Sequence, residues 1–253
     1  MAKQATVLNF DDTYVEQPFL RGSDMEWIDL RNINGTNLMC EKETLFKIQA
    51  KLQARNEKGI TFFGSGNYHY VTYLLLKEIQ TPFHLVLFDH HSDMLPSLDA
   101  FLISCGSWVL DSLNHIPLLQ KVFLIGVHEK WKKYIPEKYN DKVHVYSDSE
   151  IMDWKTFFWE LKAYPVYISI DKDVLHPLEA MTAWDHGHVK LKELVEVMIE
   201  ISTKSRIIGI DVGGEYPYRL TDSYSYHVRE AIRKNEFANQ VIFKTARKCL
   251  TAS

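Results

Sequence analysis

The sequence contains few cysteines and no long run of apolar residues. Its three cysteines, Cys40, Cys105 and Cys249, are odd in number and widely spaced, which argues against a disulfide framework and indicates reduced thiols. No stretch approaches the ~20 consecutive apolar residues of a membrane span, and no apolar signal-peptide segment follows Met1. We therefore expect a soluble cytoplasmic protein that does not bind a membrane.

A strong charge of one sign is also absent. The net charge is −4, from 29 Lys and Arg against 33 Asp and Glu, and no basic run interrupts the sequence, which argues against a nucleic-acid partner. Linkers, low-complexity tracts and internal repeats are lacking as well. The 253 residues could form one large domain or two small ones, and the uniform pattern favours a single α/β domain over residues 1–253.

Short apolar runs alternate with segments of helical period along most of the chain. The runs are nearly continuous in apolar residues, which is typical of strands covered on both faces. We expect strands at 7–10, 60–63, 84–89, 121–127, 143–146, 166–171 and 206–211, and helices at 43–57, 70–79, 148–162 and 191–203. This alternation predicts a doubly wound, mostly parallel sheet with helices on both faces, a three-layer α/β/α fold.

Acidic residues stand where two of these strands end. Asp89, His91 and Asp93 follow one apolar run at alternate positions, so their side chains project the same way along an extended chain. Asp171 and Asp173 follow another run, and Asp211 ends a third. In parallel sheets ligands gather at the carboxyl ends of the strands. The simpler interpretation, that these residues cap helices or face solvent, does not explain both motifs together.

This collection of residue types predicts a metal site. Carboxylates buried close together repel one another unless cations neutralise them. Four carboxylates and one or two imidazoles exceed the needs of one tetrahedral zinc ion, and four negative charges balance two divalent cations. Oxygen donors suit hard divalent cations, and imidazole shifts the preference toward borderline metals, which leaves Mn²⁺, Fe²⁺, Ni²⁺ and Zn²⁺ open. Two such ions acidify a shared water to hydroxide, which attacks an electrophilic carbon.

The two acidic motifs, in order and preceded by a Gly-rich segment that ends in a histidine, resemble the ureohydrolases: arginase, agmatinase, formiminoglutamase and relatives. The resemblance covers roughly residues 60–217 and includes Thr182 and the 184–187 loop. It implies the arginase/deacetylase-like fold, a homo-oligomer, and two Mn²⁺ per chain, one metal held by His69, Asp89, Asp93 and Asp171 and the other by Asp89, His91, Asp171 and Asp173.

Candidate catalytic residues also follow from the resemblance. Asp93, Glu215 and His186 are the candidates, His186 because its polar loop is expected near the mouth of the site. Glu215 stands one position beyond the place of the Glu that contacts the guanidinium in arginases. Cys105 stands where many relatives carry a histidine that shuttles protons, and we do not expect this cysteine to act as a nucleophile.

The favoured hypothesis is a hydrolase that cleaves a non-peptide C–N bond in a guanidino, amidino or amide compound through a metal-bridging hydroxide. Its partner would be that small-molecule substrate. A zinc deacetylase-like amidohydrolase with one metal is an alternative, and a phosphoesterase is a more remote one. A non-catalytic descendant that keeps the metal site for structure or ligand sensing is the third, since the shuttle histidine is replaced.

Overall fold

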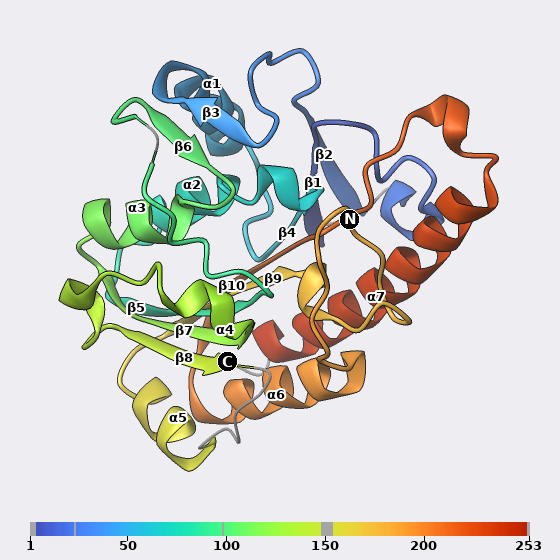
Figure 1. Cartoon of the computed structure of the whole chain (residues 1–253). Helices are drawn as coiled ribbons and strands as arrows, with labels where there is room; N and C mark the ends of the chain where they lie inside the picture. The colour runs from blue at the N-terminus through green and yellow to red at the C-terminus, as the bar shows by residue number, and fades with distance from the viewer. Residues whose placement is uncertain (1–3, 23, 98, 148–153, 252–253) are drawn as a thin grey trace.

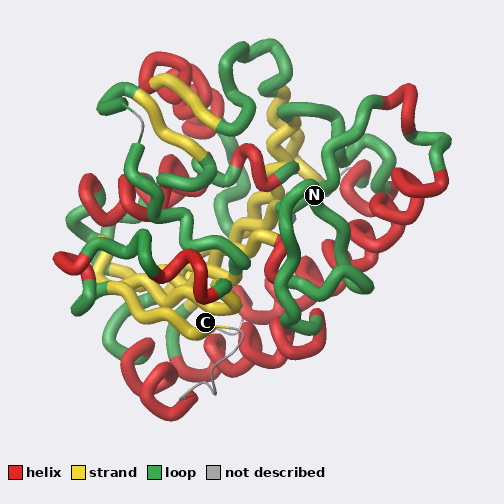
Figure 2. The backbone as a smooth tube through the Cα atoms, in the orientation of Figure 1, coloured by secondary structure: helices red, strands yellow, loops and turns green. Residues whose placement is uncertain are grey.

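The computed structural model of the protein describes residues 4–22, 24–97, 99–147 and 154–251. One eight-stranded sheet forms its centre, and every strand pairing in this sheet is parallel (Figures 1 and 2). In sheet order the strands are β2 (Met25–Asp29), β1 (Ala5–Asn9), β4 (Ile60–Gly64), β10 (Ile207–Gly213), β9 (Val166–Asp171), β5 (Phe83–Phe88), β7 (Leu119–Val127) and β8 (Val143–Ser147). A separate antiparallel pair is formed by β3 (Met39–Glu41) and β6 (Leu102–Ser104).

Helices cover both faces of the sheet. On one face lie α1 (Lys42–Gln53), α2 (Val71–Lys77) and α3 (Trp108–His115); on the other lie α5 (Trp154–Leu161), α6 (Leu191–Lys204) and α7 (Tyr226–Thr251) (Figure 1). The buried residues accordingly form two separate clusters. Ile48 and Leu74 belong to the first, and Phe157 and Ile242 to the second. The structure confirms the predicted three-layer, doubly wound α/β fold.

Helix periodicity explains how each helix meets the sheet. In α6 the buried residues Leu191, Leu194, Met198 and Ile201 recur at three- and four-residue intervals, which gives one apolar stripe. Glu193 accepts a hydrogen bond from the backbone nitrogen of Lys190 and so caps the first turn. The remaining short elements are α4 (Glu129–Lys132) and the 3₁₀ turns η1 (Pro18–Arg21), η2 (Gly66–Tyr68), η3 (Glu137–Tyr139), η4 (Lys172–Val174) and η5 (Leu220–Asp222).

The order of the strands creates a switch point near the middle of the sheet. Strands β4 and β5 are consecutive along this part of the chain, yet β10 and β9 lie between them in the sheet. The chain passes from β4 through α2 on one face and returns from β8 through α5 on the other. Such reversals open a crevice at the carboxyl ends of the strands, where ligands of doubly wound proteins bind.

Two expectations differ from the structure or lie partly outside it. Asp211 does not end its strand: β10 continues to Gly213, so Asp211 lies inside the sheet and pairs in register with Ser169. The helix expected at 148–162 is observed as α5 from Trp154 to Leu161, and positions 148–153 are outside the described residues. None of the helices in the described ranges is long and apolar enough to cross a membrane.

Candidate metal centre

The register of two neighbouring strands brings the acidic motifs together. In the pairing of β5 with β9, Phe88 lies beside Ile170, so the next residues, Asp89 and Asp171, meet at the carboxyl edge of the sheet. Both carboxylates are buried. The predicted meeting of the two motifs at one edge is therefore observed, and parallel pairing is its cause.

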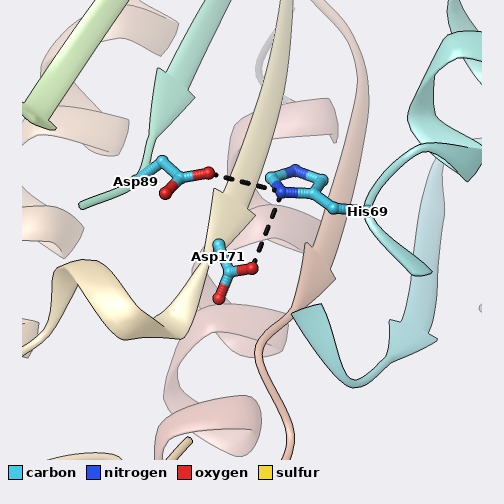
Figure 3. A group of neighbouring side chains, drawn as sticks. All are labelled: His69, Asp89 and Asp171. Atoms are coloured by element: carbon cyan, nitrogen blue, oxygen red, sulfur yellow. Dashed lines mark ion pairs between the residues drawn. The ribbon is translucent and has the colours of Figure 1, made fainter. Parts of the chain in front are cut away.

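His69 reaches the same point from a third strand. It follows β4 and the short turn η2, and its Nδ1 atom lies 3.3 Å from Asp89 Oδ2 and 3.6 Å from Asp171 Oδ2 (Figure 3). His69 is fully buried between the rings of Phe63 and Trp108, at centroid distances of 4.9 Å and 4.7 Å. One imidazole nitrogen thus faces two carboxylates, in an arrangement that could hold a cation.

A second group of donors overlaps the first. His91 Nδ1 lies 2.8 Å from Asp173 Oδ2 and 3.4 Å from Asp89 Oδ1. The two groups that could each hold a metal ion are His69, Asp89 and Asp171, and Asp89, His91 and Asp173. Asp89 is common to both, which is the arrangement expected of a carboxylate that bridges two cations.

Asp93 lies beside the first group. Its Oδ2 atom is 3.2 Å from His69 Nδ1 and accepts a hydrogen bond from Trp108 Nε1 at 2.5 Å. The backbone of Asp93 has a φ of 51°, in the left-handed region that aspartate adopts more readily than most residues. This conformation turns its carboxylate back toward His69 after the chain has left β5, and strained backbone of this kind is concentrated at functional sites.

The electrostatics of the cluster favour added positive charge. Burial, and then the negative charges of Asp173 and Asp89, raises the pKa of Asp171 to about 8. Burial and the charge of Asp89 raise the pKa of Asp173 to about 6. Burial lowers the pKa of His91, but hydrogen bonds to Asp173 and Asp89 outweigh it and raise that pKa to about 12. Buried carboxylates that lie this close to one another are stabilised by cations.

Two glycines allow the backbone to close around Asp171. A Cβ atom on Gly66 would lie 2.6 Å from Asp171 Oδ2, so any side chain there would displace this carboxylate. Gly214 has a φ of +78° and also packs directly against the carboxylate of Asp171. Glycine at the first position keeps the carboxylate of Asp171 in place, and glycine at the second adopts the left-handed conformation without strain.

A hydrogen-bonded chain fixes the orientation of His69. Ser169 Oγ donates to Asp211 Oδ1 at 2.5 Å, so it accepts from His69 Nε2 at 2.9 Å. Tyr167 donates to the other oxygen of Asp211 at 2.9 Å. The Nε2 atom of His69 therefore carries a proton, and with a cation bound the lone pair of Nδ1 would be available to it, as a metal ligand requires. Asp211 acts through Ser169 and does not itself reach the cluster.

Loss of the hydrogen bond between His69 and Ser169 should weaken metal binding. We expect Ser169→Ala to lower the affinity for Mn²⁺ about 10–100-fold, because the His69 ring loses the partner that fixes its proton and orientation. Calorimetric titration of the metal-free protein with Mn²⁺ measures the effect. Ser202→Ala, which removes a hydroxyl on α6, is the control and should leave the affinity unchanged. Equal affinities for the two variants would contradict this role.

His91 is oriented from the other side. Its Nε2 atom lies 3.1 Å from Asp185 Oδ1, and the second oxygen of Asp185 is held by Lys130 of α4. Trp131 and Trp184 flank the ring of His91 at centroid distances of 5.1 Å and 5.6 Å. The sequence analysis does not predict Asp185 as a site residue, although Asp185 lies in the 184–187 loop that the family resemblance includes.

Glu215 is buried away from the cluster. It accepts hydrogen bonds from Gln17 Nε2 at 2.8 Å and Asn239 Nδ2 at 2.7 Å, and it pairs with Lys172 Nζ at 2.5 Å. Lys172 stands between Asp171 and Asp173 and is fully buried. Glu215 does not line the cavity beside the cluster. Its contact with Lys172 favours a role in holding the motif that contains Asp171 and Asp173.

Both ring nitrogens of His186 have backbone partners away from the cluster. Its Nε2 atom accepts from the backbone nitrogen of Thr182 at 3.1 Å, and its Nδ1 atom lies 2.9 Å from the carbonyl oxygen of Leu175. Of the three candidate catalytic residues, only Asp93 therefore lies at the cluster. Cys105 lines the cavity, and burial with the nearby charge of Asp93 raises the pKa of its thiol to about 12, which is unsuited to a nucleophile.

The donor set fits a pair of divalent cations. Four carboxylates and two imidazoles are contributed by His69, Asp89, His91, Asp93, Asp171 and Asp173, all of them buried. Their oxygen-rich composition is that preferred by Mn²⁺ and similar ions. The fold and this cluster together define a doubly wound α/β protein with two overlapping candidate metal-ligand groups at the carboxyl edge of its sheet.

Comparison with known proteins agrees with this class. The sequence model of the arginase family matches residues 4–223, and the chain belongs to this family, that of the ureohydrolases. An uncharacterized protein of Thermotoga maritima is 34% identical over 209 residues, which cover 83% of this chain and 78% of that protein.

Two solved structures show the shared fold. Agmatine ureohydrolase of Thermoplasma volcanium superposes with a TM-score of 0.63 at 15% identity, covering 98% of this chain and 91% of that one. Formiminoglutamase of Trypanosoma cruzi, solved with Mn²⁺, gives a TM-score of 0.63 at 11% identity, covering 96% and 94% of the two chains.

Proposed function

We propose that this protein is a binuclear metal-dependent hydrolase that cleaves a C–N bond in a guanidino, amidino or amide compound. The observation that carries the proposal is the pair of overlapping ligand groups that share Asp89. Membership of the arginase family supports the reaction class. The single sheet, to which β1 and β10 both contribute, supports the further proposal that residues 1–253 act as one domain.

In this proposal each cation has one histidine. His69, Asp89, Asp93 and Asp171 would hold the first, and Asp89, His91, Asp171 and Asp173 the second. Mn²⁺ suits the oxygen-rich donors, and it is the metal named with the T. cruzi formiminoglutamase. When bound, two such ions supply an acidified water and polarise the carbon that is attacked.

The chain's own residues then have separable tasks. Ser169 and Asp211 keep the proton of His69 on Nε2, and Asp185 orients His91. Trp131 and Trp184 wall the cavity beside His91 and limit the water that reaches it. Asp93 would serve as a ligand, with Oδ2 held by Trp108, and not as a proton donor. Glu215 would act only through Lys172.

Metal content and turnover test the function directly. We expect protein reconstituted with Mn²⁺ to retain two equivalents after dialysis and to release amine or urea from at least one compound among arginine, agmatine, guanidine, acylated polyamines and simple amides. Chelation should abolish turnover and lower the melting temperature, and added Mn²⁺ should restore both. Retention of less than one equivalent would contradict the proposal, and one Zn²⁺ per chain would favour a deacetylase.

A further inference from the structure

The cavity beside the cluster has an apolar wall. It measures about 330 Å³, and its floor includes His69, Asp89, His91, Asp93, Asp171 and Asp173. The side chains above this floor are mainly Leu38, Met39, Leu95, Pro96, Trp131 and Trp184. A volume of this size accommodates a small organic molecule. The wall is built from separate segments: Leu38 and Met39 precede α1, Leu95 follows β5, and Trp131 belongs to α4.

The described residues of this wall include no charged group that could bind an ionic substrate. Among the described residues that line the cavity, the charged side chains all belong to the acidic cluster. Two divalent cations would balance its four carboxylates, which leaves the site close to neutral. Three further carboxylates near the cluster already have partners: Asp211 accepts hydrogen bonds from Ser169 and Tyr167, Asp185 pairs with Lys130, and Glu215 pairs with Lys172.

An ionic substrate would therefore be bound without a side chain of opposite charge. A guanidinium or amidinium group is positively charged at neutral pH and is bound most tightly beside a free carboxylate, and an α-carboxylate is bound most tightly beside a free cation. Burial of either charge against leucine and proline side chains is costly, and contact with a tryptophan ring offsets only part of that cost for a cation. A neutral group with an apolar substituent instead gains from burial on the same wall.

We propose that the cavity binds an uncharged carboxamide whose substituent is apolar or aromatic; the inference rests on the proposed function and narrows its substrate class. Hydrolysis of such an amide consumes one water. The C–N bond breaks, the carbonyl carbon gains the water oxygen and becomes a carboxylate, and the nitrogen leaves as an amine that takes up a proton.

Three hydroxamates separate the recognition of the substituent from catalysis. Benzohydroxamate, acetohydroxamate and lysine hydroxamate chelate divalent cations through the same two oxygens and differ in the attached group. For the Mn²⁺-loaded protein, calorimetry and tryptophan fluorescence are expected to show benzohydroxamate binding at least about tenfold more tightly than either of the others. Equal affinities, a preference for the cationic probe, or no binding of any probe to protein that holds two cations would overturn the proposal.

A matched pair of variants tests the wall itself. Leu95→Asp places a negative charge on the cavity wall, and Leu95→Asn has nearly the same shape without the charge. We expect Leu95→Asp to reverse the preference, with lysine hydroxamate at least about tenfold tighter than benzohydroxamate, and Leu95→Asn only to weaken benzohydroxamate. Leu178→Asp, at a position 74% exposed, is the control and should change neither affinity. An unchanged ranking in Leu95→Asp would contradict the assignment of this wall.

Turnover distinguishes failure of this inference from failure of the proposed function. N-alkyl benzamides, which are neutral and apolar, are assayed beside arginine and agmatine with the same Mn²⁺-loaded protein. If the hydroxamates rank as expected and no compound is cleaved, the ligand class is supported and the hydrolase function is contradicted. If arginine or agmatine is cleaved in preference to the benzamides, the hydrolase function stands and the neutral substrate class is overturned.

Discussion

Asp89→Asn is expected to weaken Mn²⁺ binding by more than about 100-fold at both positions and to remove hydrolytic activity with it. Removal of a residue that merely orients a ligand costs 10–100-fold, and Asp89 contributes an oxygen to both ligand groups. The amide is nearly isosteric, so its oxygen can still accept the 2.6 Å hydrogen bond from the backbone nitrogen of His91. The change therefore removes charge and a ligand while the local turn is kept.

Metal content after dialysis and a calorimetric Mn²⁺ titration measure this effect. Asp141→Asn removes one carboxylate from an exposed position and is the matched control for the change in net charge. Circular dichroism of both variants checks that the fold is retained. Two cations retained with ordinary affinity by Asp89→Asn would contradict the shared role of this residue.

Lys172→Met is expected to lower the free energy of unfolding by about 3–5 kcal/mol. Both partners of the Lys172–Glu215 pair are buried, and loss of the cation leaves the carboxylate of Glu215 with only the amides of Gln17 and Asn239. A buried charge without a counter-charge is the costly result. Because Lys172 lies between Asp171 and Asp173, weaker binding of Mn²⁺ should accompany the loss of stability.

Urea unfolding of the metal-free protein measures the change in the free energy of unfolding. The double variant Lys172→Met with Glu215→Gln should recover much of the loss, because the unpaired charge is then absent. Lys192→Met removes a lysine whose side chain is 84% exposed, and it should change the stability by no more than about 0.5 kcal/mol. A Lys172→Met effect as small as that of the control would show that the pair contributes nothing.

The sequence predicts the layers of the fold because buried parallel strands leave a strong local signal. The apolar runs at 84–89 and 166–171 correspond to β5 and β9 within one residue. Strand β2 was not predicted, since Met25–Asp29 is a short edge strand with a polar residue at its second position. The short β3 and β6 stabilise each other as an antiparallel pair, and neither carries a signal of its own.

The site was predictable where its residues adjoin strand ends. Asp171 ends a buried strand and Asp89, His91 and Asp173 come just after one, so parallel topology places all four at the same edge of the sheet. Their meeting depends on β5 and β9 being neighbours, which the sequence does not show. The surroundings of Glu215 depend on Gln17 and Asn239, which are 198 and 24 residues away in the sequence, and no local pattern reveals such contacts. Whether Asp211 lies at the end of β10 or inside it depends on how far this strand continues. The pairing of β10 with β9 extends it to Gly213, and no local pattern reveals this.

Anomalous diffraction from crystals of the Mn²⁺-loaded protein tests the central claim most directly. We predict two manganese peaks at the carboxyl edge of the sheet, one beside His69 and the other beside His91, with Asp89 contacting both. A single peak, or manganese bound elsewhere while these carboxylates remain without metal, would contradict the account.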